Sequence, residues 1–347
     1  MENITVQQRK RMILMNQHIT EKTKPEEVCH DLCGIQAQFY NHALHSLRIR
    51  SCEPLKDLDI TFYKTWALRG TLHLITREDH ALFLSAMQPH YKDHGHYYTQ
   101  FFTEKECQEL CSLILEEARA GRGNRRAFAD VMAQRGYPKE KIETACSGWG
   151  GLYSLLSVEG KLVFKDITSR DFVCCKEVQQ VEASQAREEI ILRYFQAYGP
   201  ADIRDAAYFL HWSQKEIRTV IEKYELHCYK CSDRILYGGG EIENEKRLPS
   251  VVFLGGFDPL MLGYEKHQNP FLPKEYLRRI FNLQGIVFAG ILLKGEICGK
   301  WKKDKKRLVC ELFRELNTKE YSLIEKEANR LWKGQVTELI WKKTETI

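Results

Sequence analysis

The sequence predicts an α+β fold made of three tandem winged-helix domains and a C-terminal β-barrel. Two observations support this prediction. Groups of three helix-like segments followed by a strand-like hairpin recur along the chain, and after Gly240 the sequence changes to short β-prone runs separated by glycines. The 347 residues also exceed the roughly 100–200 residues of one domain, so several domains are expected. We place the domains at residues 1–103, 104–182, 183–243 and 244–347.

Each winged-helix domain is predicted from its own helix and strand signals. The first domain fits the plan more loosely, with helices near 4–18 and 24–33 and a strand at 71–76. The second has helices at 104–119, 125–134 and 139–156, followed by a hairpin that turns at Glu159-Gly160. The third has a helix ending at Gly199-Pro200, a helix within 201–212, a helix capped by Ser213 and a hairpin within 225–240.

The C-terminal domain is predicted to be a small barrel or sheet. Its stretches VVFLGGFDPLMLGY and GIVFAGILLKGEICGKW are rich in β-prone residues, and Lys294-Gly295 suits a hairpin turn. A helix is expected at 318–332 and a last strand near 336–342.

Charge and hydropathy limit the class of partner. The formal net charge is +5, and six of the eight residues from 300 to 307 are cations. Such a run is either a solvated edge or a nucleic-acid contact, and both interpretations stay open. No stretch approaches the roughly 20 apolar residues of a membrane span, and the N-terminus shows no signal-peptide pattern. We therefore expect a cytoplasmic protein.

The cysteines and histidines raise the question of a metal site. The chain has 12 cysteines without the dense framework of a small secreted domain, so free thiols are expected. Cys228 and Cys231 have zinc-like spacing, but no second pair lies at a suitable distance. A second cluster, His90, Asp93, His94 and His96, would need a helix that Gly95 is expected to interrupt. We expect no metal, with a zinc-dependent nucleic-acid protein as an alternative.

The stretch GIQAQFY at 34–40 places Gln36 and Gln38 in apolar surroundings. A buried amide without a partner costs about 1–3 kcal/mol, so these side chains must be solvated, paired or chemically active. Gly34 is placed to end the preceding helix, so we expect the motif to be extended or tightly turned. Residues i and i+2 of an extended chain project to the same side, which would let both amides hold one water molecule.

Five stretches together resemble the AlkZ-like winged-helix DNA glycosylases. They are GIQAQ (34–38), TWALRGTLHLI (65–75), YFQAYGPADIRDAAYFLHWS (194–213), LGGFDPLMLGY (254–264) and GIVFAGILLKGEICGKWKK (285–303). The resemblance implies a C-shaped protein that grips duplex DNA on its concave side and excises alkylated purines. Gln36-Ala37-Gln38 matches the Gln-apolar-Gln motif of the AlkZ branch, which is linked to unhooking interstrand crosslinks, and not the Gln-apolar-Asp motif of the AlkX branch.

The absence of a carboxylate from this motif predicts selectivity. Glutamine cannot act as a general base, but its amide oxygen can orient a water molecule and face a developing positive charge. That help suffices when the leaving group is good, as it is for a purine alkylated at N7 or N3, which is cationic and departs neutral. We therefore expect cleavage of cationic lesions and none of neutral ones such as uracil.

Further residues are expected to support the site. Arg69, Thr71 and His73 would share one face of a strand and line the DNA cradle, although His73 also suits a structural role. Asp258 is expected to be a turn residue, with catalytic acid as the alternative. The expected phosphate or minor-groove contacts are Lys274, Arg278, Arg279 and Asn282.

The leading interpretation is a monomeric, cytoplasmic, monofunctional DNA glycosylase that needs no cofactor. Its expected partner is double-stranded DNA that contains alkylated purines, of the N7-alkylguanine type, with crosslinks as a further substrate. Fold class alone does not assign function, so a non-enzymatic winged-helix DNA-binding protein, such as a transcriptional regulator, remains the alternative.

Overall fold

The computed structural model has a mixed α+β structure. It describes residues 1–98, 100–148, 150–176, 179, 181–240, 242 and 247–343, and gives only the backbone of 89–97 and 343. The chain divides into two compact units. The discontinuous unit combines Met1–Leu55 with Ile191–Ile347, and the inserted unit is Lys56–Ile190. None of the described helices has both the length and the apolar composition needed to cross a bilayer.

The inserted unit combines short antiparallel strand pairs with helices. Its elements are α4 (Leu58–Thr61), β3 (Phe62–Trp66), η1 (Leu68–Gly70), β4 (Leu72–Thr76), α5 (His80–Tyr98), α6 (Glu104–Arg119), α7 (Arg125–Gln134), α8 (Lys139–Ala145), α9 (Gly151–Val158), β5 (Leu162–Phe164) and β6 (Phe172–Cys174). Strand β3 pairs antiparallel with β4, and β5 with β6. Phe172 lies at the centre of the core, where its ring contacts Trp66, Tyr153 and Phe164.

Two of the three helices predicted for residues 104–182 are confirmed. Helices α6 and α7 have the predicted bounds, and Thr103 and Asn124 cap them. The expected single helix at 139–156 is wrong, because the chain turns through Gly150 and Gly151, and a Cβ on Gly151 would clash with the carbonyl of Ala145. The hairpin turn at Glu159-Gly160 is also wrong. Gly160, with a φ of 74°, instead follows the end of α9.

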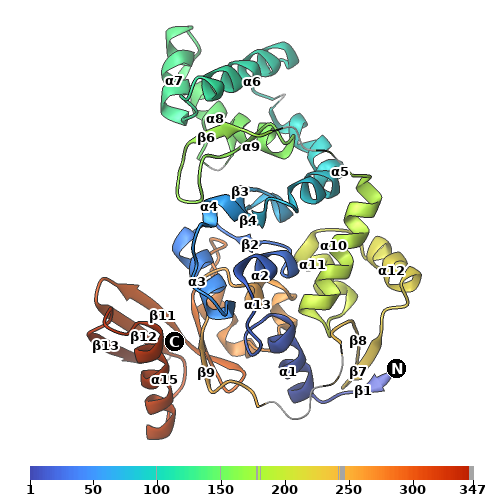
Figure 1. Cartoon of the computed structure of the whole chain (residues 1–347), viewed down its shortest axis with the longest axis vertical. Helices are drawn as coiled ribbons and strands as arrows, with labels where there is room; N and C mark the ends of the chain where they lie inside the picture. The colour runs from blue at the N-terminus through green and yellow to red at the C-terminus, as the bar shows by residue number, and fades with distance from the viewer. Residues whose placement is uncertain are drawn as a thin grey trace. The chain divides into compact units, whose positions relative to one another are not determined.

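The discontinuous unit carries the remaining elements (Figure 1). They are β1 (Glu2–Asn3), α1 (Val6–Asn16), α2 (Pro25–Asp31), β2 (Ile35–Gln36), α3 (Tyr40–Arg50), α10 (Ala183–Tyr198, which starts in the inserted unit), α11 (Ile203–Leu210), α12 (Gln214–Lys223), β7 (Cys228–Cys231), β8 (Arg234–Tyr237), β9 (Val251–Phe253), α13 (Pro259–Leu262), η2 (Lys266–Gln268), η3 (Lys274–Tyr276), α14 (Leu277–Ile280), β10 (Gly290–Leu293), β11 (Glu296–Asp304), β12 (Arg307–Leu312), α15 (Thr318–Leu331) and β13 (Glu338–Lys343).

The order of three helices and a hairpin predicted for the third domain is confirmed. Helix α10 ends one residue before Gly199, and α12 begins after its cap Ser213. Strands β7 and β8 pair antiparallel, and β1 adds a parallel strand beside β7. The winged-helix assignment itself stays a prediction.

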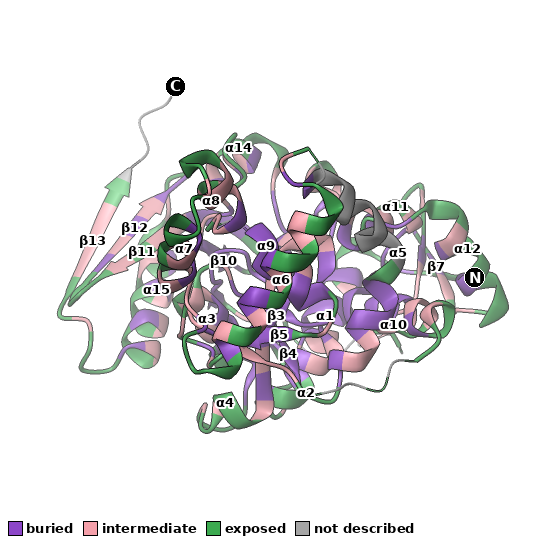
Figure 2. Cartoon of the chain, turned by 90° about the horizontal axis from the view of Figure 1, so that it is seen from above, coloured by how far each residue is buried: buried purple, intermediate pink, exposed green. Residues whose placement is uncertain are grey.

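The C-terminal region is an open sheet and not the closed barrel that the sequence predicts. Its described strands lie in the order β13-β12-β11-β10-β9, so β13 and β9 form its edges. Lys294 and Gly295, both with positive φ, form the predicted turn between β10 and β11. Ile324, Ala328 and Trp332 pack onto the sheet from α15 and its end. In Figure 2, β10 is buried, whereas β13 is largely coloured as intermediate or exposed.

Candidate active site

The Gln36-Ala37-Gln38 motif connects α2 to α3 by a short extended segment. Helix α2 is followed by Cys33 and Gly34, which both have positive φ, and the Gly34 amide donates to the Cys29 carbonyl at 2.8 Å. The chain is thereby redirected into β2, which ends at Gln36. The expectation that Gly34 ends the helix and that an extended segment follows is therefore confirmed.

The two glutamine side chains meet each other. Nε2 of Gln36 donates to Oε1 of Gln38 at 3.2 Å. Gln36 is 8% exposed, and Gln38 is half-buried. One amide of the pair is therefore buried, and the other lies partly at the surface. Their joint hold on a water molecule stays a prediction.

Helix α3, which begins directly after this motif, is anchored by a buried ion pair. Arg50 Nη2 donates to Asp258 Oδ1 at 2.7 Å and Nη1 donates to Oδ2 at 3.0 Å, and both side chains are fully buried. Asp258 also accepts from the Ser46 hydroxyl at 2.7 Å and from the Leu260 amide at 3.0 Å. Burial opposes ionisation of Asp258, but the charge of Arg50 and these hydrogen bonds hold its pKa below the usual value. Asp258 caps α13 and is too enclosed to be the catalytic acid.

The glycines before Asp258 allow this loop to approach α3 closely. A Cβ on Gly255 would lie 2.7 Å from the Ser46 hydroxyl and 2.8 Å from the His42 carbonyl oxygen. A Cβ on Gly256 would lie 3.1 Å from the His42 ring. The pair of glycines is therefore required by packing against α3, a role that the sequence motif alone does not show.

The shared strand face predicted for Arg69, Thr71 and His73 is wrong. The strand β4 begins only at Leu72, and Arg69 lies in a turn with a φ of 58°. His73 is 1% exposed, and its Nδ1 lies 2.9 Å from the Thr71 carbonyl oxygen. Burial lowers the pKa of His73 to about 3, so the ring is neutral and structural. A DNA contact by Arg69 or Thr71, both half-buried, stays a prediction.

The four residues predicted as phosphate or minor-groove contacts lie together on one short segment. Lys274 is in η3, Arg278 and Arg279 are in α14, and Asn282 follows. Lys274 and Arg278 are exposed, whereas the Arg279 guanidinium lies over the Phe313 ring at 5.3 Å. Asn282 Oδ1 accepts from the backbone amides of residues 284 and 286, so it organises the turn. Contact of this segment with DNA stays a prediction.

The cation-rich segment 300–307 forms the end of the hairpin of β11 and β12. Lys302, Lys305, Lys306 and Arg307 are exposed there, and Arg307 pairs with Glu338. The segment is therefore an exposed, predominantly cationic surface of the discontinuous unit.

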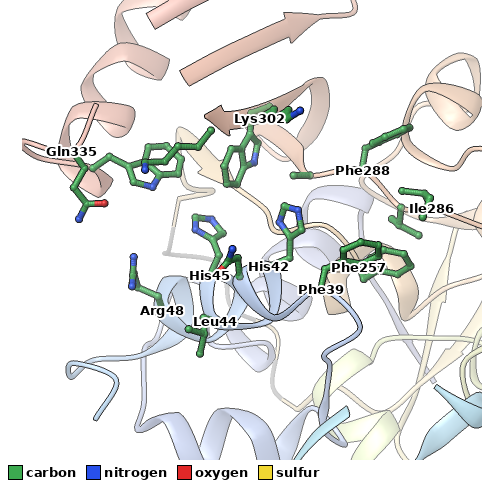
Figure 3. A pocket seen from close by; sticks show the side chains of 16 residues that line it. Phe39, His42, Leu44, His45, Arg48, Phe257, Ile286, Phe288, Lys302 and Gln335 are labelled. Atoms are coloured by element: carbon green, nitrogen blue, oxygen red, sulfur yellow. The ribbon is translucent and has the colours of Figure 1, made fainter. Parts of the chain in front are cut away.

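A cleft that the sequence does not reveal begins one residue after Gln38, and we name it the aromatic cleft. Its volume is about 650 Å³. Figure 3 shows His42, His45 and Arg48 projecting from α3, with Phe39 and Phe257 together at one end and Gln335 at the other. The lining residues are Phe39, Asn41, His42, Leu44, His45, Arg48, Phe257, Ile286, Val287, Phe288, Ala289, Trp301, Lys302, Lys303, Trp332 and Gln335.

The described residues offer no evident metal centre. Among them, no three His, Cys, Asp or Glu side chains come together as ligands. Cys228 and Cys231 lie in β7 at an odd separation, so their side chains point to opposite faces of the strand. Helix α5 runs through Gly95, so the expected interruption is wrong. The side chains of His90, Asp93, His94 and His96 lie outside the described residues.

Three comparisons place the chain among known proteins. Residues 30–333 match the family model described as "DNA glycosylase AlkZ-like". The chain is 23% identical to an "Interstrand DNA cross-link repair glycosylase" of Streptomyces sahachiroi, over 91% of this chain and 92% of that protein. The solved structure of the Streptomyces sahachiroi DNA glycosylase AlkZ superposes with a TM-score of 0.80 at 21% identity, covering 99% of this chain and 100% of the other. That similarity shows the fold.

Proposed function

This chain belongs to the DNA glycosylase AlkZ-like family, and we propose that it hydrolyses the N-glycosidic bond of cationic N-alkylated purines in duplex DNA. The observation that carries the proposal is the hydrogen-bonded pair of Gln36 and Gln38. Neither residue is a carboxylate. The carboxylate of Asp258, in the loop packed on α3, is occupied by its ion pair with Arg50. The pair can hold a water molecule through its amide groups, but it cannot take up a proton.

The chemistry then depends on the lesion. The bond from C1′ to the purine breaks with both electrons moving to the base, which was cationic and leaves neutral. The sugar becomes oxocarbenium-like, and the amide oxygens of Gln36 and Gln38 place the negative ends of their dipoles toward it. The positioned water adds to C1′, and its proton passes to solvent. Positioning of this kind lowers the entropic part of the barrier without general-base catalysis.

We further propose that interstrand crosslinks of N7-alkylguanine are substrates. The relative from Streptomyces sahachiroi carries cross-link repair in its name. A crosslinked purine is tethered to both strands and cannot swing freely into a deep pocket, so the enzyme would reach C1′ from the minor-groove side. The exposed cations of Lys274, Arg278 and the segment 300–307 suit phosphate contacts along such a path. We also propose that the enzyme acts as a cytoplasmic monomer without a cofactor, and that the four-domain division holds.

The proposal is tested by base release from duplex DNA that carries 7-methylguanine and from a crosslinked duplex. Wild type should release the base, and Gln36→Ala/Gln38→Ala should be slower by at least about tenfold, because two positioning groups are lost. Gln214→Ala, an exposed glutamine of α12, is the matched control and should behave as wild type. Release by none of the proteins refutes the enzymatic function, and a sequence-specific footprint would then favour a regulator. Equal release by all three refutes the roles of Gln36 and Gln38.

A further inference from the structure

The walls of the aromatic cleft are rings held in fixed positions. Nε1 of Trp301 donates to the Leu254 carbonyl at 2.8 Å, and Nε2 of His45 lies 2.6 Å from the Phe253 carbonyl oxygen. The His45 and Trp332 rings stack, with centroids 5.7 Å apart at 13°. Such rings lose little conformational freedom when a flat molecule enters, so the cleft is preorganised for one.

The charged residues of the cleft are cations. Arg48, Lys302 and Lys303 line it, and no carboxylate occurs among the lining residues that the structure describes. Burial lowers the pKa values of His42 and His45, the latter to about 4, so both imidazoles are neutral at pH 7. Neutral rings and permanent cations in one cleft complement a molecule that has a flat uncharged part and an anionic part.

Two side chains of the cleft have capacity left for a ligand. Phe39 is 46% exposed, and one face of its ring stacks on Phe257 at 5.4 Å and 16°. The half-buried ring of His42 has no hydrogen bond to any described residue, although it contacts Phe39 and Trp301 edge-on. A base that stacked here would meet an aromatic face and an imidazole able to read its edge.

We propose that the aromatic cleft holds one nucleotide that has left the base stack next to the lesion, with its base among the rings and its phosphates at Arg48, Lys302 and Lys303. This inference rests on the proposed function, because only a DNA-bound enzyme would meet such a nucleotide. The cleft volume of about 650 Å³ is within the range of roughly 300–1,000 Å³ that is usual for small-ligand sites. The occupant is a neighbour of the lesion, since a crosslinked purine cannot itself move.

A residue suited to fill the vacated place in the stack lies beside the cleft. Leu283 is 86% exposed, three residues before Ile286, which lines the cleft. Its turn is rigid, because Asn282 Oδ1 accepts two backbone amides and Gly285 has a φ of 80°. Proteins that unstack DNA commonly insert such an apolar side chain between bases, and Leu283 takes this role.

The test uses two lesion-free duplexes that contain 2-aminopurine, either paired with thymine or as a single unpaired bulge. Wild type should bind the bulged duplex about five- to a hundredfold more tightly, the range that stacking of one base on aromatic side chains gives. Emission of the bulged 2-aminopurine should fall on binding as it stacks among the rings. Phe39→Ala/Phe288→Ala and Leu283→Ala should each reduce the preference to less than about twofold.

Controls separate this inference from the function on which it rests. Ile60→Ala removes another apolar side chain, 72% exposed, and should keep the full preference for the bulge. Lys302→Glu should weaken binding of both duplexes, and Lys215→Glu on α12 should not. If wild type binds both duplexes equally, or if the cleft variants keep its preference, the inference is refuted even when 7-methylguanine is still released. If wild type releases no base, the proposed function fails instead.

Discussion

Replacement of Asp258 by Asn would test whether the buried pair with Arg50 holds α3 in place behind the glutamine motif. Asn has nearly the same size and is an equally good helix cap, so the exchange removes mainly the charge. It leaves the Arg50 guanidinium, which is 0% exposed, without its counter-charge. Removing one partner of a buried ion pair costs about 3–5 kcal/mol, and the free energy of unfolding of Asp258→Asn should fall by that amount. The whole free energy of unfolding of a typical protein is about 5–15 kcal/mol, so this loss is large.

The assay is urea unfolding followed by tryptophan fluorescence, which Trp301 and Trp332 report from the region around α3. Arg48→Met is the matched control, because Arg48 is exposed on the same helix, and it should change the free energy of unfolding by no more than about 0.5 kcal/mol. The double variant Arg50→Met/Asp258→Asn should lose less free energy of unfolding than the two single variants lose together, by at least about 2 kcal/mol. In the double variant neither charge is left buried without its partner. A loss below about 1 kcal/mol for Asp258→Asn would show that the pair does not anchor α3.

The burial of His45, the packing at Gly255 and the charge of Lys302 each have a consequence that can be measured. Burial lowers the pKa of His45 in the folded protein to about 4, below its value in the unfolded chain, so stability that is present above about pH 6.5 is lost as the pH falls toward 4. His45→Gln keeps the hydrogen bond to Phe253 and should make the plot of the free energy of unfolding against pH shallower by about 1.4 kcal/mol per pH unit in this window. An unchanged slope would contradict this. Gly255→Ala should lower the free energy of unfolding by about 1–3 kcal/mol, because its Cβ would press on Ser46 and on the His42 carbonyl. Gly148 has open space around it, so Gly148→Ala should not lower the free energy of unfolding. Equal effects of the two substitutions in thermal or urea unfolding would refute the packing argument. Lys302→Ala should lower the slope of log affinity for duplex DNA against log salt by about one, as expected for one lost phosphate contact, and a slope equal to that of wild type would remove Lys302 from the DNA surface.

Local signals explain why much of the fold can be predicted from the sequence. Helix α6 is confirmed at its predicted bounds because a cap at Thr103 and a regular apolar face act within one segment. The turn at Lys294-Gly295 is confirmed because positive φ angles favour glycine within a tight hairpin. The extended segment Ile35–Gln36, where the glutamine motif begins, follows in the same way from the glycine placed after α2.

The features that could not be predicted from the sequence also have physical reasons. Gly160 serves equally well at the end of a helix or in a hairpin, and only the packing of α9 decides between them. Arg69 adopts a left-handed conformation that is uncommon for a residue other than glycine. It therefore cannot share a strand face with Thr71 and His73. The aromatic cleft is assembled from α3, β11 and the end of α15, and Asp258 meets Arg50 across 208 positions of sequence. No local periodicity reports contacts of that range.

Single-turnover kinetics would show whether Gln36 and Gln38 assist only a leaving group that already carries positive charge. One duplex sequence would carry either 7-methylguanine or a neutral lesion, hypoxanthine or uracil, at the same position. We expect wild type to release 7-methylguanine well above the rate without enzyme and Gln36→Ala/Gln38→Ala to release it more slowly. Neither neutral base should be released above the rate without enzyme. Cleavage of uracil or hypoxanthine at a rate similar to that of 7-methylguanine would refute this role of Gln36 and Gln38, because such a reaction needs an acid or a base that the two amides cannot supply.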